Sequence, residues 1–219
     1  MGMRSNIITI IGNVASGKTS AAPLIVEALG ADFLDADTLF QTEDPFRELY
    51  LQNTKRWALT NELWLTMRRA ELLEQAIAIN SGKPLVIDSG LLMSWVYTYS
   101  HLAVGNISQD EWELYEKVYN SVTKNLLSEL TVIHLNYSMP TLLKRLKQRG
   151  RDYELAYYTQ DYLMQLEIGI HELIKQLNLG SVSIIEVPEE EVSDFVHNDK
   201  HSKMLKEKII DCIEVCLES

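Results

Sequence analysis

The chain of 219 residues has little cysteine, a shortage of basic charge and no long hydrophobic run. Its two cysteines, Cys212 and Cys216, lie in a stretch that predicts a helix, so we expect small apolar side chains rather than a redox pair or metal site. A net charge of −11 argues against nucleic acid as a partner. Without a membrane-length apolar run or a signal-peptide pattern, we expect a cytoplasmic protein with no membrane partner.

Length and composition predict one globular domain over residues 1–219. Short apolar runs predict strands at Asn6–Ile11, Asp32–Asp35, Pro84–Asp88, Leu130–Asn136 and Val182–Val187. Longer patterns between them predict helices at Lys18–Leu29, Thr60–Asn80, Asp110–Ser128, Pro140–Arg149, Thr159–Leu177 and Ser202–Leu217. This alternation predicts an α/β fold, with a five-stranded, mostly parallel sheet covered by helices on both faces.

One segment between the first strand and the first helix has the pattern of a phosphate-binding loop. Its eight residues are Gly12, Asn13, Val14, Ala15, Ser16, Gly17, Lys18 and Thr19. The buried strand before it and the helix after it, which includes Ser20, are the context that the motif requires. The alternative, a glycine-rich turn without a ligand, does not account for all eight positions in register.

Each part of this loop has a physical role. The glycines let several backbone N–H groups point at phosphate oxygens, and the helix N-terminus favours an anion. Lys18 brings a positive charge to the outer phosphates, and the Thr19 hydroxyl is a natural Mg²⁺ ligand. We therefore expect the chain to bind a nucleoside triphosphate with Mg²⁺.

Carboxylates end two of the predicted strands, at the edge where open α/β sheets bind ligands. Asp35 and Asp37 follow the second strand, and Asp88 ends the third. Asp35 or Asp37 is a candidate base for a phosphoryl acceptor, and Asp88 is a candidate ligand of Mg²⁺ or of its waters. The alternative for each residue alone is a helix cap or a turn.

The densest basic segment runs from Arg145 to Glu154, at the end of a predicted helix. Arginines there would bind phosphate oxygens and neutralise the charge on a transferring phosphoryl group, which is typical of a mobile lid. Basic residues that offset a helix dipole are the alternative. That alternative explains Lys147 and Arg149 but not Arg151, which lies beyond a glycine.

These segments together resemble the deoxynucleoside kinase family, from about Asn6 to about Leu177. The loop matches that of the family, including Asn13, and the lid pattern matches at Arg145, at Arg149-Gly150-Arg151 and at Glu154. The resemblance implies a P-loop kinase fold with an Arg-rich lid, and a homodimer. It also implies that Arg145 lies near the donor base, that Arg149 and Arg151 contact phosphates, and that Glu154 accepts a hydrogen bond from the sugar 3′-hydroxyl.

The resemblance extends to the acceptor side. Tyr50, shortly before Trp57-Ala58, corresponds to the second ligand of the 3′-hydroxyl in the family. The family base, an acidic residue that closes the second strand and acts on the 5′-hydroxyl, corresponds by position to Asp35, with Asp37 as a near rival. The implied activity is transfer of a phosphoryl group from ATP to the 5′-hydroxyl of a deoxynucleoside.

The chain departs from the family in two motifs. The family has Glu-Pro where this chain has Asp-Ala-Asp, and it has an acidic residue, Arg and Ser or Thr where this chain has Asp88-Ser89-Gly90. The missing Arg, which anchors the 5′ side of the acceptor in the family, puts an ordinary nucleoside in question. Arg68 or Arg69 would compensate by projecting into the same cleft, and we assign Arg69 to the substrate site.

The position at which the family reads the base with Gln is Glu62 here. A carboxylate only accepts hydrogen bonds, so it suits the two N–H groups of guanine, whereas an amide suits adenine or cytosine. We therefore expect a purine substrate, with deoxyguanosine as the candidate. The alternative is a glutamate on a solvated helix face.

Three functions compete on this evidence. The first is an ATP-dependent deoxynucleoside kinase. The second is a kinase whose acceptor is a nucleoside monophosphate or another small hydroxyl compound, which the loss of the Arg at Ser89 favours. The third is a nucleotide switch or a binding module without turnover. The guanine-specificity motif of GTP switches is missing, but a degenerate kinase that only binds ATP stays open.

Overall fold

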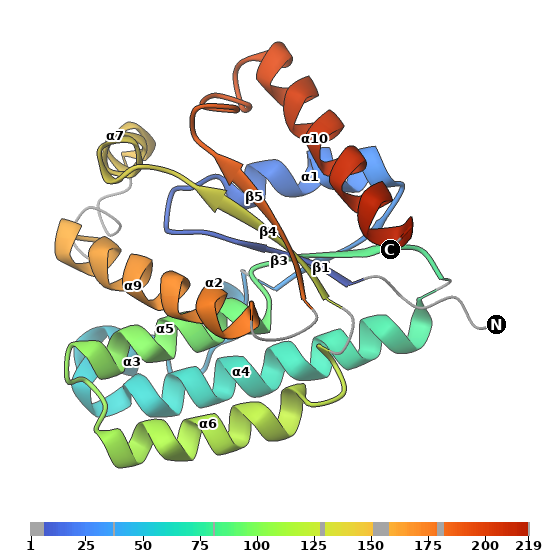
Figure 1. Ribbon diagram of the computed structural model, residues 1–219. Coiled ribbons are helices and arrows are strands. Elements are labelled where there is room, and N and C mark those ends of the chain that lie inside the picture. Colours follow the sequence, from blue (N-terminus) through green and yellow to red (C-terminus); the bar gives the residue numbers. More distant parts are fainter. Residues whose placement is uncertain are drawn as a thin grey trace.

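The computed structural model describes residues 7–36, 38–80, 82–127, 130–150, 158–178 and 182–218. Five strands form one sheet in which every pairing is parallel, in the order β2-β3-β1-β4-β5 (Figure 1). Their bounds are β1 Ile7–Ile11, β2 Asp32–Asp35, β3 Leu85–Asp88, β4 Leu130–Asn136 and β5 Ser183–Pro188. The central place of β1 puts the segment that follows it in the middle of the carboxyl edge.

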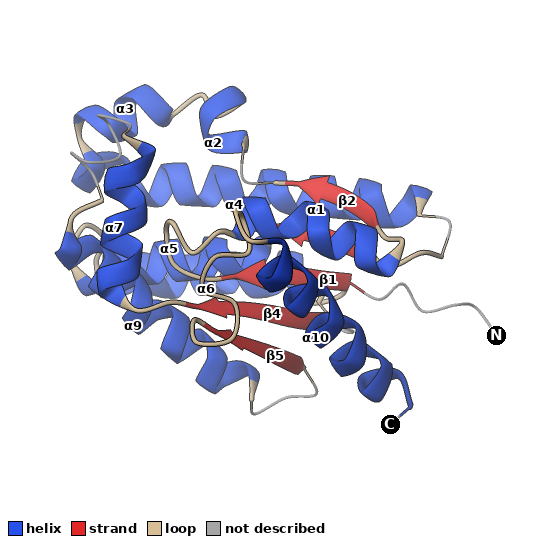
Figure 2. Cartoon of the chain, turned by 90° about the horizontal axis from the view of Figure 1, so that it is seen from above, coloured by secondary structure: helices blue, strands red, loops and turns tan. Residues whose placement is uncertain are grey.

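Helices cover both faces of the sheet (Figures 1 and 2). On one face lie α1 and α10, and on the other lie α4, α5, α6 and α9, while α2, α3 and α7 lie beyond the carboxyl ends of the strands. The bounds are α1 Lys18–Leu29, α2 Leu39–Thr42, α3 Arg47–Gln52, α4 Thr54–Ile79, α5 Leu91–Ala103, α6 Gln109–Thr123, α7 Met139–Arg149, α9 Gln160–Leu177 and α10 Asp199–Glu218.

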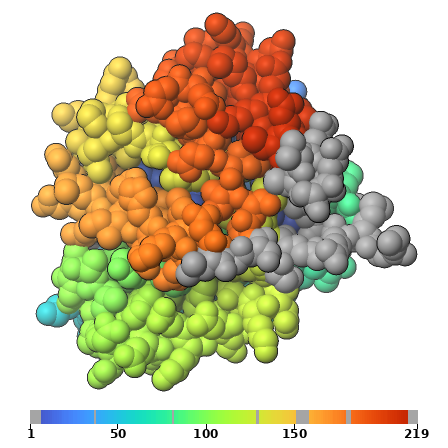
Figure 3. Space-filling model, viewed as in Figure 1, coloured from blue at the N-terminus to red at the C-terminus, as the bar shows by residue number. Residues whose placement is uncertain are grey.

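Burial explains why the strand sequences are apolar without alternation. Every residue of β1 and β3 is buried, because helices pack on both faces of these inner strands. The edge strand β2 alternates between partly buried and exposed residues. Figure 3 shows the opposite edge, where β5 and α9 form much of the visible surface. Within the residues given above, none of the helices combines the length and apolar character needed to cross a membrane.

The predicted α/β fold and the five strands are confirmed, and the sheet is wholly parallel rather than mostly so. The helix predicted at Thr60–Asn80 begins six residues earlier, at Thr54, because Asn53 caps it by accepting a hydrogen bond from the backbone N–H of Arg56 at 3.1 Å. The helix predicted to reach Ser128 ends at Thr123. Three helices, α2, α3 and α5, were missed.

An aromatic cluster joins α5 to α6. The ring of Trp95 stacks on that of Tyr99 at 5.1 Å between centroids and meets that of Trp112 edge-on at 5.3 Å. The rings of Trp112 and Tyr115 stack in turn at 5.7 Å. Trp95 and Tyr115 are buried, so these rings are part of the core that holds the two helices together.

Candidate active site

The backbone of the phosphate loop needs its glycines. Gly12 has a φ of +152°, and a Cβ atom there would lie 2.6 Å from Oγ of Ser16. Gly17 has a φ of +99°, and a Cβ atom there would lie 2.8 Å from Cζ of Phe195. Larger side chains at either position would clash, so the sequence pattern follows from the tight turn.

The polar side chains at the end of the loop lie close to its backbone and to the start of α1. The Lys18 side chain is buried, and its ammonium donates to the backbone oxygens of Gly12 and Asn13, both at 3.1 Å. Thr19 and Ser20 are exposed in the first turn of α1, beside the positive end of the helix dipole. This arrangement concentrates positive potential in one place and suits an anion with several oxygens.

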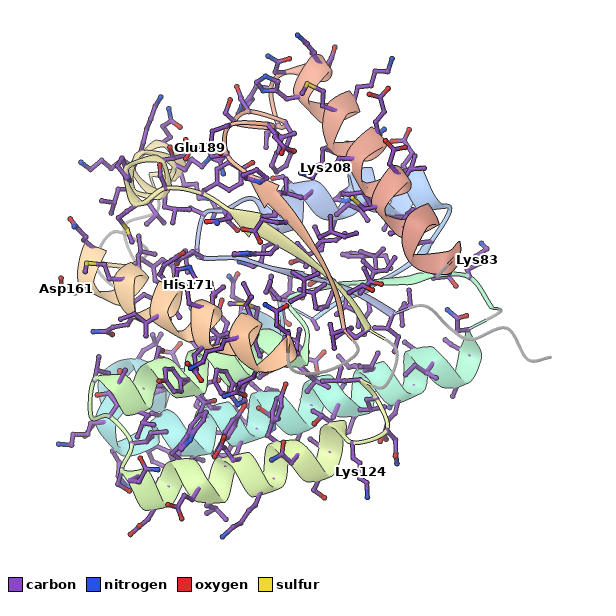
Figure 4. The ribbon with its side chains drawn as sticks, in the orientation of Figure 1. Lys83, Lys124, Asp161, His171, Glu189 and Lys208 are labelled. Carbon is purple, nitrogen blue, oxygen red and sulfur yellow. The ribbon has the colours of Figure 1, made fainter. Side chains whose placement is uncertain are left out.

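Asn13 fastens the loop to α9. Its amide nitrogen donates to the backbone oxygen of Leu163 at 2.8 Å and to Oε2 of Glu167 at 3.1 Å. Its amide oxygen accepts from the backbone N–H of Val14 at 2.8 Å. His171, which is labelled on α9 in Figure 4, lies 3.8 Å from the other carboxylate oxygen of Glu167. The loop is therefore held from a helix that lies 150 residues later in the chain.

Arg145 on α7 also contacts the loop. Its guanidinium donates to the backbone oxygens of Ala15 and Ser16, at 3.2 and 2.9 Å, and to that of Ser193 at 2.8 Å. It also lies over the ring of Tyr137, 4.0 Å from the centroid. In the structure this residue therefore orders backbone around the loop.

The segment after β5 contributes to the same region. The Tyr137 hydroxyl donates to the backbone oxygen of Val192 at 2.7 Å. Glu189, seen beside α7 in Figure 4, accepts from the backbone N–H of Ser138 at 2.9 Å and from the hydroxyl of Thr141. Burial alone would raise the pKa of Glu189, but these hydrogen bonds lower it below its usual value.

The two predicted carboxylates lie on neighbouring strands, as expected. Asp35 pairs with Asp88 in the register of β2 and β3, and Asp88 pairs with Ile10, just before the loop. Asp88 is fully buried, and its Oδ1 accepts from the backbone N–H of Ser89 at 3.0 Å. Asp35 is exposed and accepts from the backbone N–H of Thr38 at 3.3 Å. The sheet register thus places Asp88 beside the strand that leads into the loop, and Asp35 one strand further away.

Arg69 reaches this edge from α4, whereas Arg68 does not. The Arg69 guanidinium is 3% exposed and donates to the backbone oxygen of Ala36 at 3.2 Å and to the hydroxyl of Ser94 at 2.6 Å. Ala36 in turn donates its N–H to the backbone oxygen of Asp88 at 3.0 Å. Arg68 instead pairs with Glu43 and Glu71 on the outer face of the helix. Of the two candidates, Arg69 is the one that lies between the ends of β2 and β3.

Glu62 is buried on the inner face of α4, so the alternative of a solvated glutamate is wrong. Its Oε1 lies 3.9 Å from Nε2 of His101, which is also 3.2 Å from the hydroxyl of Tyr50. Burial raises the pKa of Glu62 to about 7, against the charge of Arg69, which lowers it. Burial lowers the pKa of His101 to about 4, so that ring is neutral near pH 7.

Four of the predicted side chains are not placed in this arrangement. Arg149 is exposed at the end of α7. Arg151, Glu154 and the alternative base Asp37 lie outside the described residues. The structure thus brings together the loop, Arg145, Asp35, Asp88, Arg69, Glu62 and Tyr50 along one side of the molecule.

Fold and loop together define a P-loop kinase, in which the phosphate loop follows the central strand of a parallel sheet. The chain matches the deoxynucleoside kinase family over residues 8–214, and it belongs to that family. It is therefore a deoxynucleoside kinase by family, a class of ATP-dependent phosphotransferases.

Individual relatives agree with this placement. The deoxyguanosine kinase of Bacillus subtilis (strain 168) is 27% identical over 172 residues, which cover 78% of this chain and 79% of the relative. The deoxyadenosine kinase of Dictyostelium discoideum is 26% identical over 203 residues, covering 91% and 77%. The solved structure of a deoxyadenosine kinase from M. mycoides with bound dATP is 27% identical, covers 92% of this chain and 98% of its own, and superposes with a TM-score of 0.74.

Proposed function

We propose that this chain transfers the γ-phosphoryl group of ATP to the 5′-hydroxyl of a purine deoxynucleoside, with deoxyguanosine as the preferred acceptor. The observation that carries the proposal is the carboxyl edge of the sheet. There the phosphate loop, two carboxylates and the buried Arg69 come from neighbouring elements. Phosphoryl transfer needs little more than such positioning and charge neutralisation.

On the donor side, the loop backbone and Lys18 bind the phosphates, while Arg145 shapes the region of the donor base. Thr19 and Asp88 are suited to Mg²⁺, which binds one or two protein oxygens together with phosphate oxygens and water. The exposed hydroxyl of Thr19 would bind it directly, and the buried carboxylate of Asp88 would act through water. The ion would neutralise charge on the phosphates.

On the acceptor side, Asp35 accepts the proton of the 5′-hydroxyl. Arg69 takes the place of the Arg that Ser89 replaces, and its guanidinium lies beside the ends of β2 and β3. Tyr50 and Glu154 hold the sugar 3′-hydroxyl, and Arg149 and Arg151 contact the phosphates during transfer. Glu62 reads the base, since its Oε2 has no partner in the part of the chain that the structure describes.

The test is an ADP-release assay with Mg-ATP and each of the four deoxynucleosides, run beside ribonucleosides and monophosphates. We expect strong stimulation by deoxyguanosine in the parent chain and none in Lys18→Ala, which loses the charge on the outer phosphates. If the chain binds ATP but no acceptor stimulates ADP release, the proposal would be overturned in favour of a binding module.

A second acceptor class is favoured by one observation. Ser89 is fully buried, has a φ of +29° and offers a small hydroxyl where the family has an arginine. Stimulation only by a monophosphate or by another small hydroxyl compound would mean that this change has altered the acceptor.

We also infer a homodimer in the cytoplasm. Sedimentation analysis of the purified chain tests the first inference, and fractionation of the source cells tests the second. A monomer at micromolar concentration would contradict the homodimer.

A further inference from the structure

Glu62 stands out among the buried polar groups of the molecule. Its side chain is 6% exposed, yet Oε2 has no hydrogen-bond partner among the described residues. Asn61, which is fully buried beside it, likewise has an amide without a partner in those residues. Leaving a buried polar group unsatisfied is unfavourable because its lost hydration is not replaced, so such a group calls for an explanation.

The surroundings of Glu62 contain cationic, anionic and neutral groups from several elements. The titratable or charged side chains that act on it or on which it acts are Arg69 of α4, Asp44 before α3, His101 of α5, Tyr115 of α6 and Tyr162 of α9. Tyr50 of α3 reaches this group through its hydrogen bond with His101. The guanidinium of Arg69 is already used by Ala36 and Ser94, and the neutral His101 cannot form an ion pair.

The carboxyl of Glu62 is therefore buried without an ion pair at hydrogen-bond distance. Desolvation disfavours its charged form, and the pKa of about 7 places the proton in balance near neutral pH. The charge of Arg69 lowers this pKa and that of Asp44 raises it. The hydrogen-bond donors or acceptors that a bound molecule presents to Glu62 would then decide whether the Glu62 carboxyl is protonated.

We propose that Glu62 selects the nucleobase through its own protonation, so that the ionised side chain takes guanine and the protonated side chain takes adenine or cytosine. A carboxylate accepts two hydrogen bonds, which matches the N1 and N2 protons of guanine. A neutral carboxyl donates one and accepts one, as a glutamine does, which matches the donor-and-acceptor edge of adenine or cytosine. This inference rests on the proposed function, because it takes the deoxynucleoside site as given.

The first test compares kcat/KM for deoxyguanosine and deoxyadenosine between pH 6 and 8. Groups that act on both substrates, such as the base Asp35, cancel in the ratio. Neither nucleobase titrates in this interval. We expect the ratio of deoxyguanosine to deoxyadenosine to rise about tenfold for each pH unit, since each substrate uses one protonation state of a single group. A flat ratio in an active enzyme would overturn the inference while leaving the kinase assignment intact.

Two variants sharpen this test. Glu62→Gln fixes the side chain in a form that resembles the protonated state, so the ratio should be flat and should favour deoxyadenosine and deoxycytidine. Glu116→Gln is the matched control, because burial also raises the pKa of that carboxyl, on α6. It should keep the full slope of the parent chain. A slope that survives in Glu62→Gln would place the titrating group elsewhere.

A second measurement needs neither turnover nor a variant. Calorimetric titration of each nucleoside at pH 7, in two buffers with different ionisation enthalpies, counts the protons that binding exchanges. Deoxyguanosine should release about half a proton and deoxyadenosine should take up about half a proton, since Glu62 is half-protonated at its pKa. Proton exchange of the same sign for both nucleosides would refute the inference. Opposite signs without any phosphorylation would refute the proposed function alone.

Discussion

The substitution Glu62→Gln should have a more favourable effect on the free energy of unfolding at alkaline pH than at acidic pH. The folded state raises the pKa of Glu62 from 4.5 to about 7 because the carboxyl is desolvated by burial. Below pH 4.5 both the folded and the unfolded states carry the proton, and the burial costs nothing extra. Above pH 7 the folded state must bury a charge that the unfolded state exposes to water. Stability that is present at low pH is therefore lost as pH rises through 7.

The size of this effect follows from the shift. About 2.5 pKa units correspond to roughly 3 kcal/mol, and most of this difference develops between pH 5 and pH 8. Glutamine has a similar shape and no charge to bury. The free energy of unfolding of Glu62→Gln minus that of the parent chain should therefore increase by about 2 to 3 kcal/mol from pH 5 to pH 8.

Urea unfolding of both proteins at pH 5 and pH 8 measures this difference. The titration of His101 is common to both proteins and largely cancels in the subtraction. If the difference in free energy of unfolding were the same at both pH values, Glu62 would be ionised throughout, and the account of its burial would be wrong.

Three other changes test separate parts of the site. Asp35→Asn should lower kcat by about 10²-fold or more, as loss of a general base does. If Asp37→Asn lowers kcat instead, the general base is Asp37 rather than Asp35. Gly17→Ala should raise the KM for ATP, because its Cβ would meet Phe195, whereas Gly30→Ala, with positive φ but open space, should leave KM unchanged. Arg69→Lys should lower kcat by about 10²-fold with ATP affinity kept; unaltered turnover would remove Arg69 from the site.

Local patterns were sufficient for the strands and for the phosphate loop. The central strands β1 and β3 are short apolar runs, and the loop contacts its own backbone through Lys18. Helix α5 was missed because its residues are buried on nearly every side, so its sequence lacks the period of an amphipathic helix. The early start of α4 was missed because an asparagine cap looks like a turn residue.

Contacts between distant residues account for the rest of what the sequence left open. Two arginines, Arg68 and Arg69, were equally good candidates, and only the packing of α4 shows which one faces the sheet. Glu62 looked as compatible with solvent as with a site, because burial is a property of the packed helices rather than of the residue. The close approach of Phe195 to Gly17 cannot be recognised from the residues that neighbour either of them in the sequence.

That contact between residues 17 and 195 has a consequence for the order in which the protein is made. Synthesis delivers the loop, which ends at Thr19, before it delivers β4, the partner of β1 that ends at Asn136, and Phe195 comes later still. At about 5–20 residues per second, the nascent chain carries an unfinished nucleotide site for roughly ten seconds or more. The ability to hold a nucleotide should thus appear later in synthesis than the loop that carries the motif.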